Sequence, residues 1–98
     1  MNPQQPHTEL TLLTTPDYRE SYANSVQVRV SLWDFFLQFG TISQNAPDKV
    51  SIVNFQGLFI SPQQAKALAN VLNQNIQQYE TAFGEIKLAP HTGAAVIQ

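Results

Sequence analysis

The sequence predicts an α+β fold: a short antiparallel sheet of three strands, followed by one long C-terminal amphipathic helix that packs on the sheet. Two observations support this prediction. Between residues 26 and 60, apolar side chains largely alternate with polar ones, as they do in half-buried strands. Between residues 61 and 83, apolar side chains recur every three or four positions, which is the helical period.

The first two strands are predicted at 26–32 and 33–39. In the first, every second residue is apolar and valines dominate, which favours a strand. The second has aromatic residues and leucine on one parity and begins at a bend near Trp33. Gly40 ends its clean alternation.

Turn-forming residues at 43–48, with Pro47 followed by Asp48, separate the second strand from a third at 50–60. The apolar parity of this third strand changes partway along. Residues 54–57 are therefore predicted to hold a bulge or bend.

The helix is predicted from Ser61 to Phe83. Ser61 suits the N-cap, Pro62 has no amide proton to satisfy, and Gln64 completes a capping box. Gly84 provides the stop, and Ile86 is placed to fold back over the last turn. The apolar stripe comprises Ala65, Leu68, Ala69, Leu72, Ile76, Tyr79 and Phe83.

The opposite side of this helix carries amides where most surface helices carry charges. These residues are Asn70, Asn73, Gln74, Asn75, Gln77 and Gln78. Two interpretations stay open: a neutral face in contact with solvent, or a face that contacts another chain through amide hydrogen bonds.

The domain organisation is one domain with two flanking segments. The chain has 98 residues, 43% of them apolar, which is enough for a single core. Residues 22–88 form the predicted domain. Residues 1–21 are an N-terminal tail or edge segment, with room for a fourth strand around Leu10 to Leu13, and residues 89–98 are a C-terminal tail.

Composition narrows the functional classes. The chain has no cysteine, which excludes disulfides and thiolate zinc sites. Its first residues lack the basic and apolar regions of a secretory signal, so we expect a cytoplasmic protein with no membrane segment. The net charge is −2 and the five basic residues are scattered, so no nucleic-acid partner is expected.

The residues with reactive side chains form no catalytic, metal-binding or cofactor-binding constellation. His7 and His91 lie in the two tails without ligand-spaced neighbours. Asp34 is expected to form a structural hydrogen bond at the strand bend, and Glu80 to be solvated or ion-paired. The glycines are isolated, so no phosphate-binding loop is present and we expect no enzyme and no cofactor.

Two separated blocks of sequence resemble a known family. The first runs from Tyr22-Ala23-Asn24 through Ser31, Trp33-Asp34-Phe35 and Phe39-Gly40; the second runs from Ile60-Ser61-Pro62 to Phe83-Gly84-Glu85-Ile86. Together they resemble the small prokaryotic proteins grouped as domain of unknown function 3467 (DUF3467). The resemblance covers about residues 22–86, omits the loop before Val50 and both tails, and implies a bacterial, cytoplasmic setting but no activity.

The apolar residues predict self-association. They occupy both parities of the second and third strands, whereas one helix covers only one sheet face. We expect a homodimer or higher homo-oligomer, because an ordered body this small is marginally stable alone. The residues placed at the interface are Trp33, Phe36, Val53, Phe55 and Phe59. Alternatively, residues 10–13 cover this face and keep the chain monomeric.

Three functional classes follow. The leading one is a homo-oligomeric protein-interaction module, an adaptor or accessory subunit without catalytic activity. The second is a binder of unfolded chains, similar in plan to the secretory chaperone SecB, in which a sheet and a helix form apolar grooves. A nucleic-acid binder ranks below both, and an enzyme ranks last.

Overall fold

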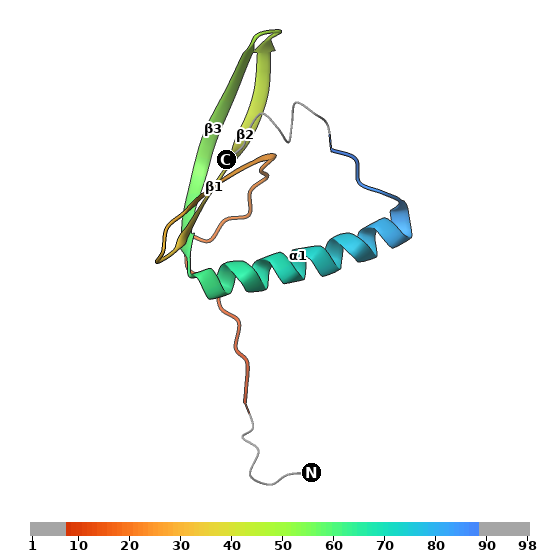
Figure 1. The fold of residues 1–98 in the computed structure, drawn as a ribbon. Coiled ribbons are helices and arrows are strands. Elements are labelled where there is room, and N and C mark those ends of the chain that lie inside the picture. The colour runs from red at the N-terminus through yellow and green to blue at the C-terminus, as the bar shows by residue number, and fades with distance from the viewer. Residues whose placement is uncertain (1–7, 89–98) are drawn as a thin grey trace.

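The computed structural model describes residues 8–88, which form a three-stranded sheet followed by one helix (Figure 1). The strands are β1 (Ser25–Val30), β2 (Phe35–Ala46) and β3 (Lys49–Ile60), and the helix is α1 (Pro62–Phe83). The sheet is antiparallel in the order β1-β2-β3. The predicted α+β class and element order are confirmed.

The loop from β1 to β2 is fixed by Ser31. Its Oγ accepts hydrogen bonds from the backbone N–H groups of Trp33 and Asp34, both at 3.1 Å, and donates to Asp34 Oδ1 at 3.2 Å. The expected structural role of Asp34 at the bend is therefore confirmed. Strand pairing ends at Val30 and resumes at Phe35, so Trp33 lies in the loop and not in the second strand.

β2 and β3 form a long hairpin that extends beyond β1 (Figure 1). The turn residues are Pro47 and Asp48, within the predicted turn region. β2 does not end near Gly40 but continues to Ala46. It continues because β-branched residues pair across the strands beyond that point, Thr41 with Val53 and Ile42 with Ile52.

The predicted bulge in β3 is confirmed and falls on Phe55. Phe39 pairs with Gln56 and Gly40 pairs with Asn54, so Phe55 is an extra residue on β3. Because facing alternates along a strand, one extra residue reverses which side of the sheet the following side chains occupy. A second irregularity lies between Gln44 and Ala46.

The described part of the N-terminal segment contributes no strand. Residues 8–24 lack strand structure, and Leu10, Leu12 and Leu13 are 82%, 84% and 87% exposed. The fourth strand is therefore absent, and these leucines do not cover the sheet. The N-terminal part of 1–21, the tail 89–98 and both histidines lie outside the described residues.

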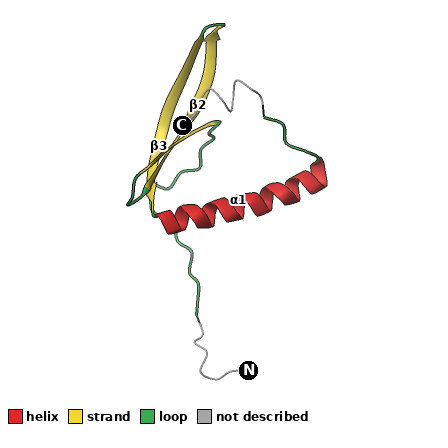
Figure 2. Cartoon of the chain, in the orientation of Figure 1, coloured by secondary structure: helices red, strands yellow, loops and turns green. Residues whose placement is uncertain are grey.

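The boundaries of α1 are those that the sequence predicts (Figure 2). At its start, Ser61 Oγ accepts a hydrogen bond from Gln64 N–H at 3.0 Å. At its end, Gly84 has φ 104° and ψ 168°, a region that only glycine adopts readily. The N–H of Ile86 donates to Glu80 Oε2 at 2.9 Å, so the chain folds back over the last turn and Glu80 has a backbone partner.

The expected packing of the helix on its own sheet is wrong. α1 leaves the end of β3 and extends away from the sheet (Figure 1), and its contacts with the strands are marginal. The connection between them is a single residue, Ser61, which is extended at φ −69° and ψ 157°. Both the capping role of Ser61 and the proline after it favour this conformation. The connection therefore does not turn α1 back onto the sheet.

As a result, the described residues form no closed hydrophobic core. No large side chain among them is fully buried, and α1 contains no buried residue. The best-protected stretch is Phe35–Gly40 of the central strand, in which only Gly40 is buried. The strand ladder and the helix caps thus define a shape whose apolar surfaces remain accessible.

The capping bond at Ser61 generates a stability prediction. Ser61→Ala removes the acceptor for Gln64 N–H and should lower the free energy of unfolding by about 1 kcal/mol, measured by urea unfolding at one fixed protein concentration. Ser61→Asp keeps an acceptor and should retain most of the stability. An equal loss in both variants would contradict the capping account.

Candidate functional site

One side of the sheet is apolar over its whole width. Residues that pair directly across strands point to the same side, and two cross-strand rows here are apolar in all three strands. We call the apolar residues on this side the apolar face; they are Val26, Val28, Val30, Phe35, Leu37, Phe39, Leu58 and Ile60. Val30 is 63% and Leu58 46% exposed, so nothing in the described chain covers this face fully.

The apolar stripe of α1 is equally uncovered. Its side chains Leu72, Ile76, Tyr79 and Phe83 are between 41% and 76% exposed. Tyr79 and Phe83 contact each other with ring centroids 5.0 Å apart, which orders the last turn. Only Ala65 and Leu68, near the sheet, are half-buried. The stripe therefore presents a continuous apolar ridge.

The opposite side of the sheet is mixed in character. We call it the mixed face and define it by Gln27, Arg29, Phe36, Gln38, Asn54 and Phe59. The rings of Phe36 and Phe59 are 4.5 Å apart, and the Arg29 guanidinium lies 4.6 Å from the Phe36 centroid. This geometry is that of a cation–π contact added to an aromatic pair. The cluster therefore places two aromatic rings and the hydrogen-bond donors of the Arg29 guanidinium side by side.

Backbone groups and small residues shape the rest of the mixed face. Asn54 folds over Gly40, since a Cβ built there would lie 2.6 Å from Asn54 Oδ1, and Asn54 Nδ2 reaches Gln27 Oε1 at 3.4 Å. Ser25 is 4% exposed, and its Oγ has no hydrogen-bond partner among residues 8–88. Asn24 Oδ1 accepts from Ile42 N–H at 2.7 Å and so extends the ladder beyond β1.

An open hollow of about 790 Å³ lies at the bulge end of the apolar face. Residues 17–23 form one wall of this hollow and β2 with β3 the other. The lining residues are Asp17, Arg19, Ser21, Tyr22, Ala23, Phe39, Thr41, Phe55 and Gln56. The N-terminal segment therefore borders this end of the apolar face and leaves the Phe35 end open.

Two exposed groups beside the hollow titrate away from their ordinary range. The Thr15 side chain, with a smaller backbone contribution, lowers the pKa of Asp17. The Tyr18 hydroxyl donates a hydrogen bond to Glu20 Oε2 at 2.8 Å, and this bond raises the pKa of Tyr18. Both side chains are exposed, and each interaction joins residues two positions apart, so its effect is confined to this segment.

The five predicted interface residues do not share one surface. Phe36 and Phe59 lie together on the mixed face, whereas Val53 pairs with Thr41 and Phe55 lines the hollow, both on the side of the apolar face. The bulge explains the separation, because its extra residue reverses the facing of the β3 residues before it relative to Phe59. Their role in self-association stays a prediction.

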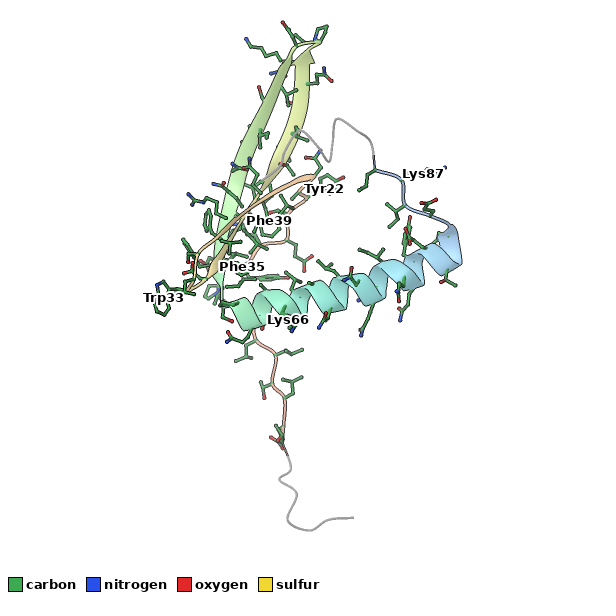
Figure 3. The ribbon with its side chains drawn as sticks, viewed as in Figure 1. Tyr22, Trp33, Phe35, Phe39, Lys66 and Lys87 are labelled. Carbon is green, nitrogen blue, oxygen red and sulfur yellow. The ribbon has the colours of Figure 1, made fainter. Side chains whose placement is uncertain are left out.

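Trp33 lies apart from both groups, at the tip of the β1–β2 loop and away from Phe35 and Phe39 (Figure 3). It is 79% exposed.

The sequence did not identify Arg29 and Gly57 as parts of the mixed face. Only the β1–β2–β3 register, which brings Arg29 opposite Phe36, and the close approach of Gly57 to the Phe36 ring reveal them.

Across residues 8–88, no group of three His, Cys, Asp or Glu side chains could hold a metal ion. Over the same span, no helix combines the length and apolar character needed to cross a membrane.

Fold and surface together define a class: a small β-β-β-α protein whose sheet and helix both present uncovered apolar surfaces. The chain belongs to the family described as Protein of unknown function (DUF3467), whose model matches residues 1–88. This match also covers the N-terminal segment, beyond the residues that carry the sequence resemblance. Comparison with curated proteins and with solved structures gave no match.

The packing of Gly57 against Phe36 can be tested directly. A Cβ at position 57 would lie 2.7 Å and 2.9 Å from ring carbons of Phe36, so Gly57→Ala must displace the ring from Phe59. We expect a loss of about 1–2 kcal/mol in urea unfolding. In a Phe36→Leu background the same substitution should be neutral or stabilising, because alanine is favoured over glycine in a strand. An equal cost in both backgrounds would refute this contact.

Proposed function

We propose that the protein is a homo-oligomeric interaction module, an adaptor or accessory subunit without catalytic activity of its own. The observation that carries this proposal is the apolar face together with the α1 stripe, both uncovered in the single chain. Exposed apolar surfaces of this extent are characteristic of interaction sites. Within the same proposal, the protein acts in the bacterial cytoplasm.

The two sides of the sheet suit two different tasks. The apolar face carries no charged residue, so it suits the permanent burial found in oligomer interfaces, which resemble a domain core. The mixed face offers Phe36, Phe59 and Arg29 in one cluster. Aromatic residues and arginine are enriched where proteins bind one another. We therefore assign self-association to the apolar face and binding of another protein to the mixed face, in place of the self-association that the sequence led us to expect of Phe36 and Phe59.

Adjacent residues of the central strand provide a matched pair of variants. Leu37 and Phe36 are neighbours that point to opposite sides of the sheet. Leu37→Asp places an unpaired charge in the proposed self-association surface, at a cost of about 3 kcal/mol or more, or about a 100-fold weaker association. Light scattering should then report the mass of one chain at concentrations where the parent is an oligomer.

Phe36→Asp should preserve the oligomer and abolish capture of a partner protein in a pull-down from the native host. The introduced carboxylate lies opposite Arg29, which compensates part of its cost. A parent protein that is monomeric at high micromolar concentration would overturn the self-association. Loss of the oligomer in Phe36→Asp but not in Leu37→Asp would reverse the assignment of the two sides.

A second candidate function is the binding of unfolded chains. The hollow favours it, because Tyr22, Phe39 and Phe55 line this open site beside polar residues that could bind the backbone of an extended chain. This function predicts that the protein suppresses aggregation of a model client at equimolar concentration, and that Phe55→Asp removes the effect. Unchanged client aggregation, followed by turbidity, would eliminate this candidate and leave the adaptor proposal standing.

A further inference from the structure

The direction of α1 is fixed by two independent constraints at its first residues. Ser61 is held extended by its hydrogen bond to Gln64 N–H, and the ring of Pro62 independently disfavours any helical conformation of Ser61. A single residue restricted in this way gives α1 few possible directions relative to β3. The helix therefore carries its stripe away from its own sheet (Figure 1).

The apolar face and the stripe match in chemistry and size. Neither contains a charged residue: α1 carries only Lys66 and Glu80, and the strands carry only Arg29, on the mixed face, and Lys49. A helix is about 10 Å wide, close to the width of two or three strands spaced about 4.8 Å apart. The 22 residues of α1 span about 33 Å. The helix is long enough to leave one sheet and cross another.

We propose that the apolar face is covered by α1 of a second copy of this chain, and that the two copies exchange their helices reciprocally. The proposal rests on the self-association proposed above and names its partner and geometry. Because the contact is the same in both directions, it forms twice around a two-fold axis. Each copy then has its apolar face and its stripe covered together.

Other arrangements of two copies cover less. Sheets packed face to face would bury both apolar faces but leave both stripes in water. Helices packed on each other would leave both apolar faces in water, with residues such as Val30 still 63% exposed. Only the exchange covers both kinds of surface with two chains, which is why we favour it.

The absence of cysteine from the sequence allows a clean crosslinking test. One chain carries Leu37→Cys on the apolar face, and a second, distinguished by a mass tag, carries a single cysteine on the stripe in place of Leu72, Ile76 or Tyr79. The two chains are unfolded, mixed in equal amounts, refolded and oxidised. Random pairing places half of the chains in mixed dimers, so crosslinking between tagged and untagged chains should approach half for at least one stripe position.

Phe36→Cys is the matched control, because it lies next to Leu37 on the opposite side of the sheet. It should give less than a tenth of the crosslink seen with Leu37→Cys. A chain that carries both cysteines, one on the apolar face and one on the stripe, tests whether α1 instead packs on its own sheet. Disulfides within one chain would show that α1 folds onto its own sheet.

The outcomes separate this inference from the function on which it rests. An oligomeric parent that gives within-chain disulfides, crosslinks through position 36, or gives no crosslink from any stripe position refutes the helix exchange and leaves the interaction module intact. A parent that light scattering shows to be monomeric refutes both.

Discussion

The single-residue connection between β3 and α1 determines where the apolar side chains of this chain can be buried. Ser61 caps the helix and precedes Pro62, and each role alone favours an extended backbone. A longer or more flexible connection would let α1 return to its own sheet and close a core within one chain. With this connection, the sheet and the helix diverge, and both keep their apolar surfaces accessible.

The sheet itself depends on an exception to regular strand geometry. The extra residue at Phe55 lets the hairpin continue beyond Gly40 while Val53 and Phe55 turn toward the side that bears Phe39. The same bulge leaves Phe36 and Phe59 together with Arg29 on the mixed face. One irregularity thus sorts the aromatic residues of β3 between two surfaces of different chemistry, which is the basis for assigning them different partners.

Much of the fold could be predicted from the sequence because its signals are local. The cap at Ser61, the stop at Gly84, the turn at Pro47 and Asp48 and the bulge near Phe55 each depend on a few neighbouring residues. The relation of α1 to the sheet could not be predicted this way, because an amphipathic stripe indicates that a surface will be buried but not which chain buries it. The surface shared by Phe36 and Arg29 depends on the β1–β2 register, which the alternation of residues within each strand does not provide.

On this proposal, the chain completes its hydrophobic core only by associating with another copy. Folding and association are then coupled, so stability must depend on protein concentration. The most direct measurement is the thermal unfolding midpoint, followed by circular dichroism, over a 100-fold range of protein concentration. We predict a midpoint that rises steadily with protein concentration. A midpoint independent of concentration, accompanied by the mass of a single chain throughout the range, would contradict it.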